Sequence, residues 1–269
     1  MTIRWARVGR LGIVAHQMPA DSPLSPALDA ALTAALALPV QRVLALDVEG
    51  RRYWLKRPER HKSWIRRLQK GDPARALAAD REGLQALAAR DLPAPRIAAA
   101  GEDFLLIEDA GRPVSRIIRD QNLPEAERHR VLIAAAEALA KLHRAGVVHG
   151  RPKIRDICWN AGRGATLIDF EAFRDGAADD ALGRDAMVFL HSVLQVRRGR
   201  DAFYDTAAAA YRAAAPERAW PAMCRRVKRF RWLMLPARLA LAVKPKAPEL
   251  RGAVILYRIL FASGNDAGP

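Results

Sequence analysis

The sequence of 269 residues is poor in cysteine, in aromatic residues and in long apolar runs. Its two cysteines, Cys158 and Cys224, have no paired spacing, which argues against a disulfide framework and a cysteine-based zinc site. No stretch approaches the roughly 20 apolar residues that a membrane-spanning helix requires. The opening "MTIRWARVGRLGIVAHQ" has an apolar run too short for a secretory signal. A reducing cytoplasm is therefore the expected location.

Acidic residues are also scarce, because 29 Asp and Glu face 45 Lys and Arg, a formal net charge of +16. Such a surplus attracts nucleotide phosphate, nucleic acid, anionic lipid or phosphorylated sugar, and does not choose among them. An arginine-rich and alanine-rich genomic composition produces the same surplus. Hydrophobic residues at 51% with charged residues at 28% are typical of a globular protein, large enough for one two-lobed domain or two small ones.

The first half of the chain mixes helix and strand patterns. Alanine-rich stretches at 26–37, 132–140 and 207–215 predict helices, the first with Ser25 as its cap. The run "VQRVLALDVEGRRYWLK" predicts a β-hairpin with a Glu49-Gly50 turn. A helix is expected in "DPARALAADREGLQALAAR" and a second hairpin in "RIAAAGEDFLLIED".

The second half is mainly helical. A long helix is predicted from residue 124 to Gly146, followed by short strands in "VVHG", "DICWN" and "TLIDFE", and by helices over 181–262. The predicted fold class is α+β with two lobes. It has an N-terminal extension with a helix (1–39), a small β-rich lobe (40–111), a hinge near 108–112 and a larger helical lobe (112–269).

Six fragments between residues 40 and 195 stand in a meaningful order. They are "YWLKRP", "DREGLQALAARDLPAP", "FLLIEDAG", "LHRAGVVHG", "TLIDFE" and "GRDAM". In this order the chain resembles the protein-kinase-like superfamily, and most closely the lipopolysaccharide core kinases that phosphorylate Kdo or heptose. The resemblance implies an enzyme that uses ATP and Mg²⁺ and transfers the γ-phosphate to a sugar hydroxyl or a protein side chain.

The resemblance also assigns roles to single residues. Lys56 matches the strand lysine that reaches the α- and β-phosphates, and Glu82 matches the helix glutamate that holds this lysine. Glu108 matches the hinge, where backbone groups hold adenine. Asp169 matches the metal-binding aspartate of the DFG segment, with Glu171 in place of the glycine.

The stretch "VVHGRPKIRDICW" matches the catalytic loop with one departure. His149 and Lys153 match, Asp156 replaces the metal-binding asparagine, and Arg151 replaces the catalytic aspartate. An aspartate for an asparagine keeps an oxygen ligand. A guanidinium in place of a carboxylate removes the base, because it stays protonated and only donates hydrogen bonds.

Three interpretations of Arg151 follow from this departure. Arg151 and Lys153 could neutralise the transferred phosphoryl group, with Asp156 as base or second metal ligand. The chain could instead be a pseudokinase that binds a nucleotide or a partner without transferring phosphate. Alternatively the alignment is slipped, and Arg155-Asp156 is itself the "RD" pair.

Two neighbouring features bear on the same site. No glycine-rich loop precedes Lys56, since Gly50 belongs to a hairpin turn and the glycines at 9 and 12 are remote, so the affinity for nucleotide is in question. Asp185 in "GRDAM" resembles the aspartate that bonds the catalytic-loop backbone. His143 is interpreted as an ordinary helix-end histidine.

The segment "CRRVKRFRWLMLPARLALAVKPK" interleaves cations with apolar residues. It predicts either a contact with an anionic membrane surface or glycolipid, or an amphipathic helix whose apolar face is core. The first interpretation would place a cytoplasmic protein at the inner face of the membrane. Nucleic acid is disfavoured as a partner, because no groove-reading helix or aromatic platform is recognisable.

Overall fold

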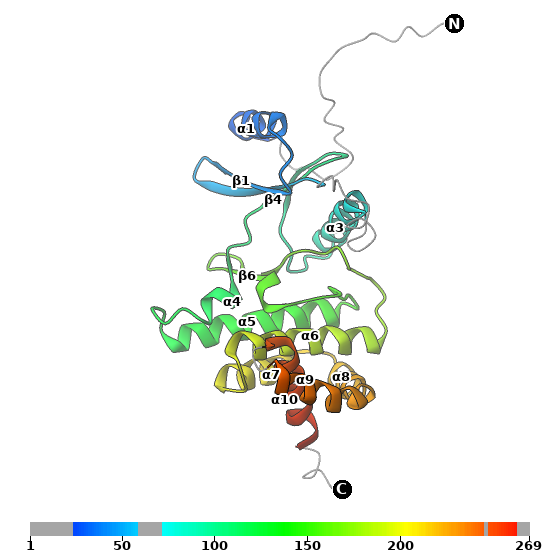
Figure 1. Cartoon of the computed structure of the whole chain (residues 1–269). Coiled ribbons are helices and arrows are strands. Elements are labelled where there is room, and N and C mark those ends of the chain that lie inside the picture. The colour runs from blue at the N-terminus through cyan, green and yellow to red at the C-terminus, as the bar shows by residue number, and fades with distance from the viewer. Residues whose placement is uncertain (1–23, 59–71, 245–246, 263–269) are drawn as a thin grey trace, which may run out of the picture. The chain divides into compact units, whose positions relative to one another are not determined.

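The computed structural model describes residues 24–58, 72–244 and 247–262 (Figure 1). The chain divides into two compact units. Among the described residues, the first unit comprises 24–58, 72–77 and 97–108, and the second comprises 78–96 and the chain from 109 onward. The first contains a small antiparallel sheet and the second is larger and mainly helical, which confirms the predicted α+β class.

Helix α1 (Pro26–Ala37) begins as the sequence predicts. The Ser25 hydroxyl accepts a hydrogen bond from the Leu28 N–H at 3.2 Å, and proline occupies the first helical position, where no N–H is needed. The helix then buries one face against the sheet of the first unit. The helix and the sheet together form one buried apolar cluster, which comprises Leu28, Leu32, Ala35, Tyr53, Leu55, Phe104 and Leu106.

Both predicted hairpins are confirmed. The antiparallel sheet has the order β1-β2-β4-β3, with β1 (Val43–Val48), β2 (Arg51–Lys56), β3 (Ile97–Ala100) and β4 (Leu105–Glu108). Glu49 and Gly50 form the first turn with φ of 51° and 74°, the left-handed conformation that two-residue hairpin turns require. Strand β2 ends at Lys56, which lies opposite Leu105 of β4.

Helix α3 (Pro73–Ala88) confirms the predicted helix, with Leu84 and Leu87 fully buried. The long predicted helix is α5 (Glu125–Arg144), and its Leu132, Leu139 and Leu142 are buried. Spacing of three and four residues places these leucines on one face, so burial of that face stabilises each helix.

The second unit has its own sheet, with the order β5-β6-β7. Its strands are β5 (Arg112–Pro113), β6 (Ile157–Asn160) and β7 (Gly164–Leu167), and the short helices α4 (Val114–Ile117) and η1 (Ile154–Asp156) lie beside them in the sequence. The predicted strand "VVHG" is wrong, since only a single bridge joins Val148 to Arg174. The N–H groups of the next two residues, His149 and Gly150, donate to the side chain of Asp185 and not to a neighbouring strand.

The predicted helical remainder is confirmed. It consists of α6 (Asp179–Arg197), α7 (Ala202–Ala214), α8 (Ala219–Arg229), η2 (Arg231–Leu233), α9 (Met234–Val243) and α10 (Pro248–Ala262). Within the second unit, α6 packs against α7, α8 and α10, and α5 packs against α7. Among the described residues, no helix combines the length and apolar character needed to cross a bilayer.

Candidate functional site

Residues 147–156, the predicted catalytic loop and called the catalytic loop below, are anchored by Asp185 of α6. The Asp185 carboxylate accepts hydrogen bonds from the His149 N–H at 2.8 Å and from the Gly150 N–H at 3.1 Å. The carboxylate is fully buried, where bonds to a charged acceptor are strong. These are the bonds that the resemblance implies for Asp185.

His143 belongs to the same buried network. Its Nε2 lies 3.6 Å from the Asp185 carboxylate, and its Nδ1 lies 2.7 Å from the hydroxyl of Tyr211. The interpretation of His143 as an ordinary helix-end residue was therefore too simple, because its ring connects α5 to the carboxylate beneath the loop. No local sequence signal marks this contact, since the two residues are far apart in the chain.

His149 connects the catalytic loop to the strand end that carries Asp169. Its Nε2 lies 2.8 Å from the Ile168 carbonyl oxygen, and its Nδ1 accepts from the Arg151 N–H at 3.3 Å. Since Nδ1 accepts, the ring proton belongs on Nε2, which then donates to Ile168. His149 thus has a structural role between two backbone segments and offers no free nitrogen for acid-base chemistry.

Asp156 and Asp169 lie side by side at one end of the β6-β7 pair. The Ile168 N–H donates to the Asp156 carbonyl at 2.9 Å, which extends the ladder by one step beyond the Ile157-Leu167 pair. Burial raises the pKa of Asp156 above its ordinary value, the guanidinium of Arg155 at 3.4 Å opposes this, and the negative charge of Asp169 raises that pKa further. The structure therefore brings together the two carboxylates that the sequence predicted as metal ligands.

This donor set fits magnesium bound together with a nucleotide. Mg²⁺ takes oxygen ligands, and proteins usually supply one or two carboxylates while phosphate oxygens and water complete the shell. A cation between Asp156 and Asp169 would relieve the repulsion that raises the pKa of Asp156. Within the described ranges, no cluster of three or more His, Cys, Asp or Glu residues could hold a metal without such help.

Asp80 of α3 anchors the segment after Asp169. Its carboxylate accepts a hydrogen bond from the Phe170 N–H at 2.7 Å, and both residues are buried. Asp169 itself has φ of 68°, a left-handed conformation that aspartate tolerates better than most residues. Glu171, which stands in the glycine's place, is exposed.

Sequence reasoning missed Asp80, although a signal was available. Asp80 precedes Leu84 by four residues and Leu87 by seven, so the three share the buried face of α3. Glu82 is exposed, because a step of two residues turns the side chain to the opposite side of the helix. Close approach on the buried face also explains Gly83, where a Cβ would lie 2.9 Å from the Cβ of Phe170.

The cations of the loop lie at its surface. Arg151 is exposed and Lys153 is half-buried. Burial raises the pKa of Asp156 overall, and the positive charge of Arg151 is a smaller opposing influence on that one carboxylate. Donors in this position suit an anionic group that arrives from solvent.

The remaining predicted site residues belong to the first unit. Lys56 is half-buried at the end of β2, and Glu108 is half-buried at the end of β4. The pairing of Lys56 with Glu82, and the adenine site near Glu108, stay predictions. The glycines at 9 and 12 lie outside the described residues.

Comparison with known proteins relates part of this chain to a protein family. Residues 40–156 match the model of the phosphotransferase enzyme family, a range that runs from the first hairpin through Asp156. This match, over less than half of the chain, makes residues 40–156 similar to a family of the protein-kinase-like superfamily. Among its relatives is a protein of Haemophilus influenzae, described as uncharacterized, which is 31% identical over 221 residues. The aligned region covers 81% of this chain and 88% of that protein.

Proposed function

We propose that this protein is a phosphotransferase that uses ATP and Mg²⁺ to phosphorylate a hydroxyl group of a sugar, as lipopolysaccharide core kinases do, or of a protein side chain. The observation that carries the proposal is the adjacency of Asp156, at the end of a loop anchored by Asp185, and Asp169, which follows β7. Two carboxylates on fixed backbone provide what a magnesium-bound triphosphate needs.

Each residue has a role in this proposal. Asp156 and Asp169 would hold Mg²⁺, which would neutralise charge on the phosphates when bound. Lys56, held by Glu82, would contact the α- and β-phosphates, and the strand end at Glu108 would face adenine. The acceptor oxygen forms a bond to the γ-phosphorus while the bond from that phosphorus to the bridging oxygen of ADP breaks.

The geometry supports one interpretation of Arg151 over the slipped alignment. Asp185 bonds the N–H groups of His149 and Gly150, which favours the alignment that puts Arg151 where related loops carry aspartate. Arg151 and Lys153 would stabilise the transferred group, because phosphoryl transfer depends more on positioning and electrostatics than on a base. The hydroxyl proton would pass to Asp156 or to solvent.

A pseudokinase is the second candidate, and the exposed Arg151 is what favours it. Without a carboxylate at this position the loop has lost the group that accepts the hydroxyl proton in related enzymes. Such a protein would bind a nucleotide or a partner and would not turn over ATP.

A thermal shift with millimolar ATP, with and without Mg²⁺, tests the proposal. Ligand at about 100 times its Kd stabilises the folded state by about 2.7 kcal/mol, so a rise of several degrees in Tm is expected only when both are present. Asp169→Asn should abolish this rise. Asp175→Asn, the same change at an exposed aspartate of the following loop, should keep it.

The outcomes separate the candidates. No rise for the unchanged protein would overturn both nucleotide-dependent proposals. A rise that neither needs Mg²⁺ nor responds to Asp169→Asn would favour the pseudokinase. If Mg·ATP binds, ATP turnover with a panel of glycolipid and protein acceptors follows. Arg151→Asp should then lower turnover, whereas a gain of turnover would show that the arginine had replaced a needed base.

A further inference from the structure

We propose that residues 225–244, here termed the C-terminal docking surface, bind the surface of an anionic phospholipid bilayer. The surface comprises the end of α8, η2 and α9. The proposal does not rest on phosphotransfer, since it concerns elements remote in sequence from the catalytic loop and uses none of its residues.

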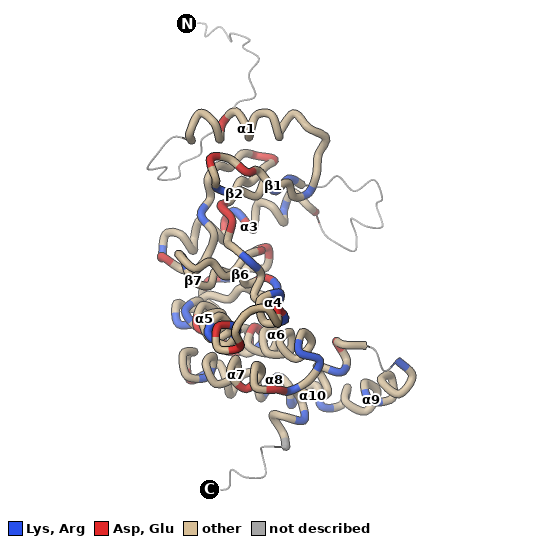
Figure 2. Tube along the Cα trace, turned by 90° about the vertical axis from the view of Figure 1, so that its left-hand side faces the viewer, with Lys and Arg blue, Asp and Glu red and all other residues tan. Residues whose placement is uncertain are grey.

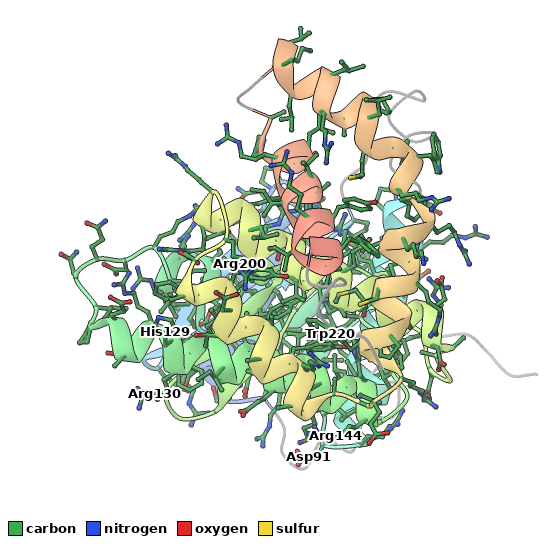
Figure 3. All side chains as sticks on the ribbon, turned by 90° about the horizontal axis from the view of Figure 1, so that it is seen from below. Asp91, His129, Arg130, Arg144, Arg200 and Trp220 are labelled. Atoms are coloured by element: carbon green, nitrogen blue, oxygen red, sulfur yellow. The ribbon has the colours of Figure 1, made fainter. Side chains whose placement is uncertain are left out.

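The docking surface exposes an apolar stripe. Trp232, Leu235, Leu239 and Val243 are 68%, 68%, 62% and 81% exposed. Their spacing of three and four residues puts them on one side of α9 and the turn before it. In Figure 3 the orange ribbon of α9 lies at the edge of the second unit, and no other coloured element covers its outer side. Scattered exposed apolar residues are ordinary, but a contiguous stripe marks an interaction surface.

The opposite side of α9 is apolar too. Met234, Ala237, Ala240 and Leu241 are half-buried, and α9 packs against α10. A surface helix of a globular protein normally needs only one apolar face, whereas a helix that is apolar all round is found in a core or in lipid. The reading of this segment as a helix with an apolar core face therefore explains the inner side and leaves the outer stripe without a role.

Basic residues surround the stripe. Between residues 219 and 262 the sequence has ten Lys and Arg and one acid, Glu249. Figure 2 shows blue segments along α8, α9 and α10. Arg226 pairs with Asp180 at 2.6 Å. In the described part of the chain, six others make no ion pair with a carboxylate: Arg225, Lys228, Arg229, Arg231, Arg238 and Lys244.

An anionic bilayer accounts for both features at once. Aliphatic and indole side chains would enter the boundary between headgroups and acyl chains, while the cations would contact anionic headgroups. Nucleic acid would satisfy the charge but not the aliphatic stripe, and a second copy of this chain would bring like charges together. With 10 residues, α9 is about 15 Å long, so it would lie on the membrane and not span it.

Sedimentation of the full-length protein with vesicles tests the proposal. The probes are vesicles of phosphatidylcholine alone and of phosphatidylcholine with about 30 mol% phosphatidylglycerol. We expect binding only to the anionic vesicles, weakened at higher salt. Leu235→Gln with Leu239→Gln should lower partitioning by about tenfold or more. Replacing Arg229, Arg231 and Arg238 by Gln should lower it by about fivefold for each lost cation.

Controls keep the outcomes informative. Leu38→Gln with Val40→Gln changes two aliphatic residues of the first unit, 51% and 49% exposed, and should leave binding unchanged. All replaced side chains are exposed, so thermal melting should confirm that each variant folds. Equal binding to neutral vesicles, no binding, or unaltered binding by the Leu235/Leu239 variant would overturn the proposal. So would a dimer that this variant converts to a monomer, because the stripe would then join two copies.

Discussion

Gly150 shows how a single residue can determine the shape of the catalytic loop. Its φ is +89°, and a Cβ at this position would lie 2.3 Å from the Ala172 carbonyl oxygen. Gly150→Ala should therefore lower the free energy of unfolding by about 2 to 3 kcal/mol, through strain and a clash with backbone. Urea denaturation followed by circular dichroism measures this loss.

Gly176 provides the matched control for that prediction. Its φ is +63°, and no heavy atom lies within 4 Å of the position its Cβ would take. Gly176→Ala should lower the free energy of unfolding by only about 1 kcal/mol, from backbone strain alone. Equal losses at the two glycines would contradict the claim that Ala172 leaves no room beside Gly150.

Cys158 should be the less reactive of the two thiols. Burial raises the pKa of Cys158 from 9.0 to about 12, and the nearby carboxylates of Asp109, Asp156 and Asp169 add to the effect. The thiolate is the reactive form, so at pH 8 the folded protein holds about a thousandfold less thiolate at Cys158 than an ordinary cysteine would. As long as the pH stays below that pKa, the labelling rate of Cys158 should increase about tenfold for each unit by which the pH is raised.

Alkylation of the Cys224→Ser variant at several pH values measures this dependence. The single remaining thiol should label slowly in buffer and rapidly in denaturing urea. The unchanged protein should label first at Cys224, which is only half-buried. Labelling of Cys158 in buffer at the rate of a free thiol would show that β6 opens more readily than its burial indicates.

At the scale of elements, the buried face of α3 holds the segment after Asp169, because Asp80 accepts a hydrogen bond from the Phe170 N–H. Asp80→Ala would leave the buried Phe170 N–H without its acceptor, so we expect a loss of about 1 to 3 kcal/mol in the free energy of unfolding. Glu82→Ala, two residues on and exposed, should change it by less than about 0.5 kcal/mol.

The same pair of variants separates stability from ligand binding. If Glu82 holds Lys56 as predicted, Glu82→Ala should weaken the Tm rise with Mg·ATP although it leaves the unliganded protein stable. Equal destabilisation by both variants would contradict the division of α3 into a buried and an exposed side. Thermal melting with and without Mg·ATP provides both measurements.

The elements that the sequence predicted correctly share a physical basis. The hairpin turn at Glu49-Gly50, the Ser25 cap and the leucine spacing of α3 all depend on residues a few positions apart. The strand predicted in "VVHG" failed because propensity describes only the local chain. A buried carboxylate 36 residues away takes the N–H of His149, which a strand partner would otherwise have bound.

At the scale of the whole molecule, the surplus of positive charge should weaken the folded state by self-repulsion. A formal net charge of +16 is large for 269 residues. Raising sodium chloride from about 20 mM to about 300 mM screens this repulsion. A gain of about 1 kcal/mol, or about 2 to 4 °C in Tm, is expected, and calorimetry measures it.

Sodium sulfate at the same ionic strength is the control for specific binding. Screening depends on ionic strength, so both salts should raise Tm by similar amounts. A rise with sulfate alone would contradict simple screening, because binding of sulfate or its exclusion from the protein surface would then be the cause.

The sequence by itself determined most of the helices and strands, the α+β class and the order of the six kinase-like fragments, because these depend on residues that are near neighbours in the chain. Only the tertiary structure decided which acid of α3 is buried, that Asp169 lies near enough to Asp156 to raise its pKa, and that Asp185 holds the loop. The contacts that decide these features join residues far apart in the chain, up to the 90 positions between Asp80 and Phe170. Such partners are chosen by packing and by the need of buried N–H groups for acceptors, which no local pattern records.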